Sequence, residues 1–237
     1  MCDVCGCGDP RILPVDVHES LLAGNDAMAE HLRQHFAEAG VLAINLMGSP
    51  GSGKTALLEA TARHAGAFRI GAVSGDLATD RDAVRLRRAG VDAVSITTGS
   101  ACHLDADMVH HALHHVPWRK ADLFFIENVG NLVCPAIYDV GQAASVVVLS
   151  VTEGEDKPLK YPVMFRKADL VLLSKVDLLP HLDVDVEAIE EALAHVMPEP
   201  RLIPISAVTG QGMQSWLAWL EAHRPAAARV LEQHVHA

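Results

Sequence analysis

The chain is short of basic residues and has no long apolar run. Its 237 residues include 19 Lys and Arg against 30 Asp and Glu, a formal net charge of −11. Proteins that bind nucleic acid need a basic footprint, so this class is excluded. Apolar runs such as Val146–Leu149 are too short to cross a bilayer, and a basic-then-apolar leader is missing. We therefore expect a soluble, cytoplasmic protein that binds neither nucleic acid nor a membrane.

The cysteines do not form the pattern of a disulfide framework. There are five, an odd number, and Cys2, Cys5 and Cys7 fall within the first seven residues. A disulfide framework would distribute its cysteines over the fold, and a reducing cytoplasm would keep such bridges open. Clustered thiols in that compartment favour metal binding.

The middle of the chain alternates short apolar runs with helical patterns. Residues 1–16 are rich in Gly and Pro and are expected to form an irregular tail, whereas residues 17–237 form one domain that begins with a helix over His18–Ala39. Continuous apolar strands alternating with helices predict an α/β fold, with a mostly parallel sheet flanked by helices. The expected strands are Val41–Met47, Phe68–Ser74, Ala93–Thr97, Leu123–Glu127, Ser145–Val151, Leu170–Ser174 and Leu202–Ile205, and the expected later helices are Lys54–His64, Arg81–Ala89, Ala106–Val116, Asp185–Val196 and Met213–His223.

A phosphate-binding loop follows the first expected strand. Gly48–Thr55 fits the pattern G-x-x-x-x-G-K-[ST] in full and precedes a helix. Glycines let backbone N–H groups surround phosphates, Lys54 should reach the β- and γ-phosphates, and the Thr55 hydroxyl should ligate Mg²⁺. The fold is therefore predicted to be a P-loop NTPase. The nucleotide contacts expected from this loop are Gly48, Gly51, Ser52, Gly53, Lys54 and Thr55.

A second segment indicates that the base is guanine. Ser174-Lys-Val-Asp177 follows an expected strand and resembles the N-K-x-D motif of GTPases, with Ser in place of Asn. Asp177 would accept hydrogen bonds from the guanine N1–H and amine, and the Lys175 stem would cover the base. Ser206-Ala207 resembles the loop whose backbone contacts the guanine O6. A solvated Lys–Asp turn is the alternative; together the two segments predict GTP and GDP as ligands.

The γ-phosphate side is less regular. Glu127-Asn-Val-Gly130 resembles the D-x-x-G switch motif with Glu for Asp, so the Gly130 N–H would sense the γ-phosphate and Glu127 would hold Mg²⁺. Asp76 is the other carboxylate candidate. The predicted catalytic set is therefore Lys54, Thr55, Asp76 and Glu127. Because no catalytic glutamine or arginine finger is evident, slow intrinsic hydrolysis is expected.

The remaining cysteines suggest a metal site on the same switch. Cys102, His103 and Cys134 offer two thiolates and an imidazole, a soft but incomplete set suited to Zn²⁺ or Ni²⁺. Cys134 lies four residues after Gly130, so loss of the γ-phosphate should move it. A symmetric partner or water would complete the coordination. The alternative is two thiols buried as small hydrophobic groups.

Two further groups of possible ligands lie elsewhere. Cys2, Cys5 and Cys7 form C-x-x-C-x-C; with Met1 removed, the Cys2 amine would add a nitrogen and give a planar set suited to Ni(II), the alternative being inert thiols. Two i,i+4 histidine pairs also occur on the helix expected over residues 106–116, and they either bind metal or form a solvated face. These are His110, His111, His114 and His115.

Taken together, these motifs resemble one family, the hydrogenase nickel-incorporation GTPases known as HypB. The segments that carry the resemblance are Cys2–Cys7, Gly48–Thr55, Ala101–Asp105, Glu127–Pro135, Ser150–Pro158 and Ser174–Leu178. The resemblance implies GTP hydrolysis, a metal-bridged homodimer, and nickel passed to a hydrogenase large-subunit precursor with the zinc-binding partner HypA. It also implies nickel or zinc at Cys102, His103 and Cys134, and a tight nickel site in the tail.

Three other classes share some of these features. A urease-accessory nickel GTPase would have the P-loop and guanine motif, but E-S-G-G in place of Glu127–Gly130 and no cysteine tail. A metal-binding module with a vestigial nucleotide site is disfavoured by intact Lys54, Thr55 and Asp177. A P-loop ATPase or small-molecule kinase is disfavoured by the guanine motif.

Overall fold

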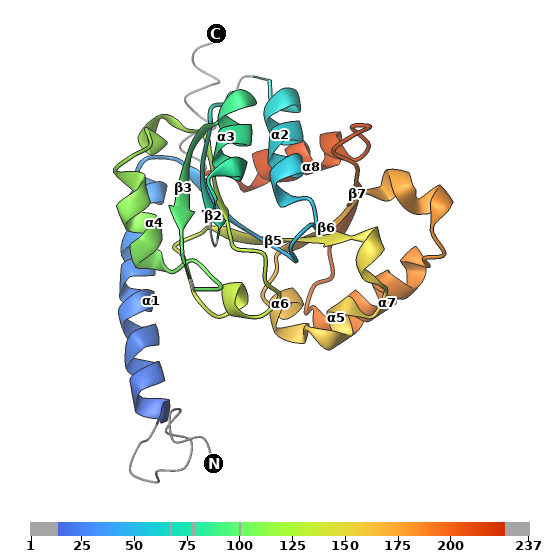
Figure 1. The fold of residues 1–237 in the computed structure, drawn as a ribbon, viewed down its shortest axis with the longest axis horizontal. Coiled ribbons are helices and arrows are strands. Elements are labelled where there is room, and N and C mark those ends of the chain that lie inside the picture. Colours follow the sequence, from blue (N-terminus) through green and yellow to red (C-terminus); the bar gives the residue numbers. More distant parts are fainter. Residues whose placement is uncertain (1–13, 67, 77–78, 100, 226–237) are drawn as a thin grey trace.

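A computed structural model describes residues 14–66, 68–76, 79–99 and 101–225, with side chains from residue 22 onward. Within these ranges, seven strands form one parallel sheet in the order β3-β2-β4-β1-β5-β6-β7 (Figure 1). The strands are β1 Leu42–Met47, β2 Ile70–Asp76, β3 Asp92–Thr97, β4 Leu123–Glu127, β5 Ala144–Ser150, β6 Leu170–Ser174 and β7 Leu202–Ile205. The predicted fold class and all seven predicted strands are confirmed.

Helices cover both faces of this sheet (Figure 1). They are α1 Pro14–Glu38, α2 Lys54–His64, α3 Arg81–Arg88, α4 Ala106–Leu113, α5 Lys157–Lys160, α6 Pro162–Arg166, α7 Val186–Val196 and α8 Met213–His223. Short 3₁₀ turns lie at Trp118–Lys120, Cys134–Ala136, Val151–Glu153 and Val176–His181. No helix among the described residues is long and apolar enough to span a bilayer.

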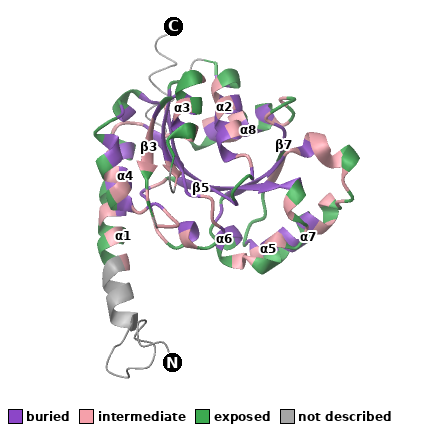
Figure 2. Ribbon diagram, in the orientation of Figure 1, coloured by how far each residue is buried: buried purple, intermediate pink, exposed green. Residues whose placement is uncertain are grey.

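The period of two along each strand divides the core between the two faces. In β1, Leu42, Ile44 and Leu46 pack on the side of α2 and α8, whereas Ala43 points to the side of α1 and α4. A third cluster lies between β5, β6 and the helices α6 and α7. The central strands are buried on both faces, which is why they read as continuous apolar runs (Figure 2).

Helix α8 is fixed to α2 by one large side chain. Trp216 is fully buried, and its indole N–H donates to the Thr61 hydroxyl at 3.0 Å. The Thr61 hydroxyl in turn donates to the carbonyl of Leu57 at 2.8 Å. Truncating a buried Trp to Ala typically costs about 3–5 kcal/mol, so this contact is a major anchor for the last helix.

Proline lies in the first turn of three helices, including Pro14, which was expected to belong to the irregular tail. Helix α1 starts at Pro14, earlier than the predicted His18, and α5 and α6 carry Pro158 and Pro162 in their first turns. Proline is compatible with the first turn because its φ is already helical and the first N–H groups have no intrahelical partner. The predicted tail residues Cys2, Cys5 and Cys7 lie outside the described residues.

Candidate functional site

The phosphate-binding loop connects β1 to α2 and depends on two glycines. Gly48 has φ +145°, and a Cβ there would lie 2.4 Å from the carbonyl oxygen of Val148 on β5. Gly53 has φ +102°, a conformation that other residues rarely adopt. The loop can therefore lie close to the sheet edge, where the carboxyl ends of the parallel strands gather.

The Lys54 side chain is enclosed by its own loop. It is 8% exposed, and its ammonium donates to the carbonyl oxygens of Gly48 and Ser49 at 3.0 and 3.1 Å. Burial lowers the pKa of Lys54, an effect opposed by carboxylates including Glu127. Ser49 donates a hydrogen bond to Glu153, which connects the loop to the end of β5. Lys54 is thus a buried cation that contacts no carboxylate directly among the residues the structure describes.

Glu127, at the end of β4, is hydrogen-bonded to side chains at the start of α2 and on β2. It is 3% exposed, and its two carboxylate oxygens accept hydrogen bonds from Thr55 at 2.6 Å and Ser74 at 2.8 Å. Burial raises the pKa of Glu127, while these hydrogen bonds and the Lys54 charge lower it. The structure therefore brings together three of the four predicted catalytic residues, Lys54, Thr55 and Glu127.

A cavity of about 370 Å³ opens in front of this cluster. Its lining includes Lys54, Thr55, Asp76, Asp82, Arg85, Glu127 and Gly130. A hydroxyl and carboxylates facing a phosphate loop form a hard-oxygen donor set that fits hydrated Mg²⁺. Sequence reasoning missed Arg85, which hydrogen-bonds Glu59 at 2.8 and 3.0 Å, because nothing in a helix-surface arginine marks it as facing a cavity.

The guanine-motif residues lie beside the same loop. Lys175 donates to the carbonyl of Gly51 at 2.7 Å and has φ +61°. Ser174 donates to the carbonyl of Ser52 at 2.6 Å, so its side chain holds the loop. Asp177 is half-buried beyond them. The substitution of Ser for Asn thus keeps a hydrogen bond to the phosphate loop.

Ser206 and Ala207 follow the neighbouring strand. Ser174 on β6 is paired with Ile205 on β7, so both predicted base-contacting segments leave the sheet at the same edge. The buried Ser206 hydroxyl accepts from the N–H groups of Val208 and Thr209, which fixes the turn. These hydrogen bonds position the turn but do not identify the base, so guanine remains a prediction.

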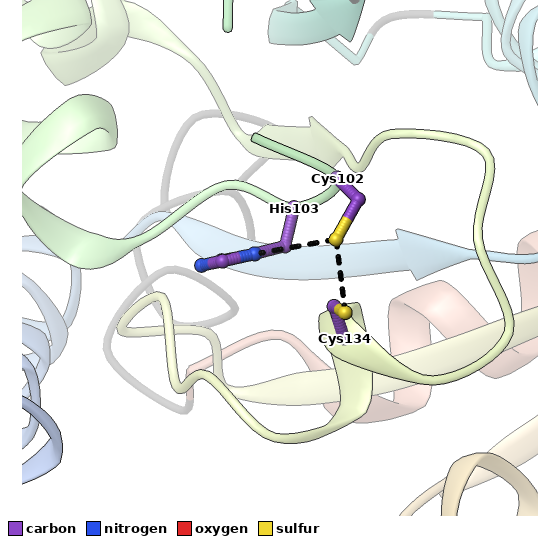
Figure 3. Close-up of side chains that lie close together, drawn as sticks. All are labelled: Cys102, His103 and Cys134. Carbon is purple, nitrogen blue, oxygen red and sulfur yellow. Dashed lines mark hydrogen bonds between the residues drawn. The ribbon is translucent and has the colours of Figure 1, made fainter. Parts of the chain in front are cut away.

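The three predicted ligands of the domain metal site converge (Figure 3). All ligand atoms of Cys102, His103 and Cys134 lie within 4.8 Å of one another, and each residue is half-buried. The Cys102 thiol donates to the Cys134 sulfur over 2.9 Å. This hydrogen bond, followed by burial, raises the pKa of the Cys134 thiol. Among the described residues, no other group of three potential ligands is this close.

Tyr138 supports the imidazole of this cluster. Its ring stacks on His103 with centroids 3.8 Å apart and an interplanar angle of 17°. Burial lowers the pKa of His103, which favours the neutral imidazole that binds metals. Tyr138 carries no motif signal, and only the folded contact identifies it.

The metal segment and the phosphate loop touch directly. A Cβ on Gly130 would lie 2.9 Å from backbone atoms of Pro50, so only glycine allows this approach. One residue further, Asn131 forms an isolated antiparallel bridge with Gly48. Cys134 is therefore three residues from a backbone contact with the nucleotide loop.

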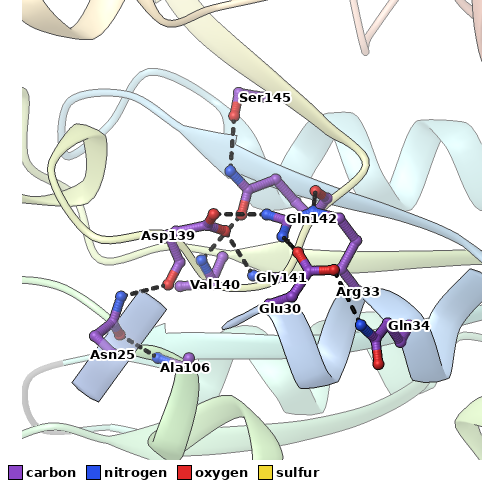
Figure 4. Close-up of polar contacts among 10 residues, drawn as sticks. All are labelled: Asn25, Glu30, Arg33, Gln34, Ala106, Asp139, Val140, Gly141, Gln142 and Ser145. Carbon is purple, nitrogen blue, oxygen red and sulfur yellow. Dashed lines mark hydrogen bonds and ion pairs between the residues drawn. The ribbon is translucent and has the colours of Figure 1, made fainter. Parts of the chain in front are cut away.

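Helix α1 connects the two segments that carry the predicted metal ligands (Figure 4). The Asn25 carboxamide accepts from the Ala106 N–H at 2.9 Å, just beyond His103, and donates to the Asp139 carbonyl at 2.9 Å, beyond Cys134. Arg33 forms an ion pair with the Asp139 carboxylate at 2.6 Å. Asn25 and Arg33 were not singled out in the sequence because their partners are distant along the chain.

In the structure the rings of His110 and His114, one of the two predicted pairs, lie close together, with centroids 5.3 Å apart. His110 is half-buried beside α1, and His114 lies just beyond the end of α4. His111 is exposed and contacts Asp107, and His115 is also exposed.

Comparisons with known proteins agree with these arrangements. The family model described as the CobW/HypB/UreG nucleotide-binding domain matches residues 42–204. The chain is 51% identical over 220 residues to hydrogenase maturation factor HypB of Azotobacter vinelandii, covering 92% of this chain and 72% of that protein. It superposes on HypB from Helicobacter pylori in complex with nickel with TM-score 0.81 and 40% identity, covering 86% of this chain and 98% of the other. It also superposes on HypB from Archaeoglobus fulgidus with TM-score 0.77 and 40% identity, covering 85% of this chain and 98% of the other.

Proposed function

Since the chain belongs to the HypB hydrogenase maturation factors of the CobW/HypB/UreG family, we propose that it is a GTP-hydrolysing metallochaperone acting in the cytoplasm. It binds nickel as cargo, with zinc able to occupy the same thiolate site, and delivers nickel to a hydrogenase large-subunit precursor. The zinc-binding protein HypA is the proposed partner in delivery. The observation that carries this function is a cluster of two thiols and an imidazole in which Cys134 lies three residues from a contact with the phosphate loop.

The nucleotide part of the mechanism rests on charges that are already in position. Lys54 is held at the phosphate loop and would exchange its carbonyl partners for β- and γ-phosphate oxygens. Thr55 and Glu127 would hold Mg²⁺, directly or through water, and the ion would neutralise charge on the phosphates. Asp177 would select guanine, and Ser206-Ala207 would contact its O6 edge.

The coupling part rests on the short segment from Gly130 to Cys134. A γ-phosphate would bind the Gly130 N–H, whose position is already limited by Pro50. Because Asn131 is paired with Gly48, a shift at Gly130 would reach Cys134 over a short tether. GTP would therefore change the position of one thiolate relative to Cys102, and hydrolysis would reset it for transfer.

The same cluster supports a homodimer. Two thiolates and one imidazole leave a four-coordinate ion one donor short, so a two-fold related copy could close the site. Val133 and Ile137, on either side of Cys134, are 45% and 36% exposed. These apolar side chains would be covered in such a dimer, so GTP and metal would each favour it.

The test is nickel titration of the full chain with GDP and with a non-hydrolysable GTP analogue. Reciprocal coupling is typically worth about 1–3 kcal/mol, so nickel affinity should change roughly 5- to 150-fold, and nickel should change the analogue's affinity equally. Sedimentation with GDP and with the analogue, each with and without nickel, should show the largest dimer fraction with analogue and metal together. Equal nickel affinity and equal dimer fraction in both nucleotide states would contradict the coupling.

A further inference from the structure

A second group of histidines forms where α1 packs on α4. The two helices lie side by side (Figure 1), and each carries histidines four residues apart on the facing side: His31 and His35 on α1, and His110 with His114 at the end of α4. Ring centroids are 4.1 Å apart for His31 and His35, 5.8 Å for His31 and His110, and 5.3 Å for His110 and His114.

These separations can be compared with what a shared ion requires. Two imidazoles bound to one tetrahedral ion at metal–nitrogen distances of about 2.0–2.1 Å have ring centroids roughly 5 Å apart. The pairs His31–His110 and His110–His114 come close to this spacing, whereas the rings of His31 and His35, tilted by 55°, lie too close together. His110 is therefore the shared member of both suitable pairs.

The rings are accessible and can rotate. His31 and His114 are exposed. A cavity of about 330 Å³ is lined by residues that include His110, His114 and His35, the α1 residue one turn after His31. The nitrogens of three rings do not yet lie within 4.8 Å of one another, so binding needs side-chain rotation. That rotation is inexpensive for the exposed His31 and His114.

We propose that His31, His110 and His114 form a second metal site in the domain, which binds a borderline divalent transition ion such as Ni²⁺ or Zn²⁺ through imidazole nitrogens alone. It is separate from the thiolate site and does not depend on the nucleotide-coupled function proposed above. Burial, followed by the neighbouring histidines, lowers the pKa of His110, which keeps this central ring neutral and able to bind.

The charges nearby limit the strength of this site. Arg119 and Lys120 also line the cavity and repel a divalent ion, although the Arg119 guanidinium lies over the Trp118 ring at 4.5 Å. Asp107 provides the opposing negative charge beside His110. We therefore expect binding in the micromolar range and fast exchange, in contrast to a site built from thiolates.

The experiment uses the full-length chain with all five cysteines replaced by serine, which removes both thiolate candidates. Isothermal titration with Ni²⁺ should show one equivalent without a thiolate-to-nickel absorption band. The variant His31→Ala/His114→Ala, at two exposed positions, should bind at least about tenfold more weakly. His115→Ala, an exposed histidine at the end of the same segment, is the matched control and should bind normally.

A parallel count in the cysteine-containing chain guards against misfolding of the serine variant. Equilibrium dialysis with excess Ni²⁺ should find one equivalent more in the unaltered chain than in His31→Ala/His114→Ala. The proposal is overturned if the two chains bind equal equivalents, or if His115→Ala loses as much, which would indicate diffuse binding by surface histidines. GTP hydrolysis should be the same in all these histidine variants, so failure of the proposed GTPase function would be seen separately.

Discussion

The nucleotide site and the predicted metal site, the two halves of this region, differ in how much of each site one chain supplies. Lys54, Thr55 and Glu127 are at most 8% exposed, and their polar atoms already have partners within the fold. Cys102, His103 and Cys134 are half-buried, and their sulfur atoms mainly contact each other. The nucleotide half is organised before any ligand arrives, whereas the predicted metal half offers three donors, one fewer than a four-coordinate ion takes. Under the proposed function, this less complete half is the one suited to pass its ligand to another protein.

The largest effect is expected at the nucleotide half. Lys54→Ala should lower GTP hydrolysis by roughly 10²–10³-fold, because it removes the cation placed for the transferred phosphoryl group. Within the described part of the chain its buried ammonium hydrogen-bonds to loop carbonyls alone, so thermal unfolding should change little. Lys120→Ala, at an exposed lysine, is the control. A cooperative loss of fold in Lys54→Ala would show that this half depends on Lys54 for structure.

Nickel binding at the predicted metal site should be lost without an effect on nucleotide binding. Cys134→Ala, tested with Cys2, Cys5 and Cys7 replaced by serine, should weaken nickel binding by more than the roughly 10–100-fold of a lost outer-shell partner. GDP affinity should be unchanged, since Cys134 does not line the nucleotide cavity. The thiolate-to-nickel absorption band is the readout, and Glu190→Ala, at an exposed position on α7, is the control. An unaltered band would place the site elsewhere.

A smaller change should alter which nucleotide is bound. Asp177→Asn removes a charged acceptor for two guanine donors, which should cost about 3 kcal/mol or roughly 100-fold in GTP affinity. Xanthosine triphosphate, which presents the complementary edge, should gain affinity. Competition against a fluorescent GDP analogue would measure both. If the unaltered chain binds ATP as tightly as GTP, the assignment of guanine is wrong.

The smallest effect is expected where α1 supports the metal half from behind. Asn25→Ala leaves the Ala106 N–H and the Asp139 carbonyl without partners, which should lower the free energy of unfolding by about 1–3 kcal/mol. Nickel affinity should fall roughly tenfold, as for other outer-shell contacts, with GDP affinity unchanged. Asn25→Asp keeps the acceptor for Ala106 and should lose less. Gln34→Ala, on the exposed face of α1, should change neither quantity.

The fold followed from apolar periodicity because the central strands are buried on both faces and the glycine loops are local. Strand order did not, since it depends on pairings such as that of β1 with β4 and β5. Motif spacing identified Thr55 and Glu127 but gave no sign that they share a hydrogen bond. Non-local packing also hid the role of Ser174, the stack of Tyr138 on His103, and the meeting of histidines from α1 and α4.

The backbone bridge between Gly48 and Asn131 makes the length of the chain that follows it a functional quantity. Only Leu132 and Val133 separate this bridge from Cys134, and Leu132 is anchored in the core. The two residues between the bridge and Cys134 therefore cannot accommodate an added residue without moving Cys134. Under the proposed coupling, an insertion between Asn131 and Cys134 would leave the residues that bind nucleotide and the residues that bind metal in place. It would, however, remove the effect of one ligand on the affinity for the other. This stretch should therefore tolerate exchanges of side chain far better than changes in length.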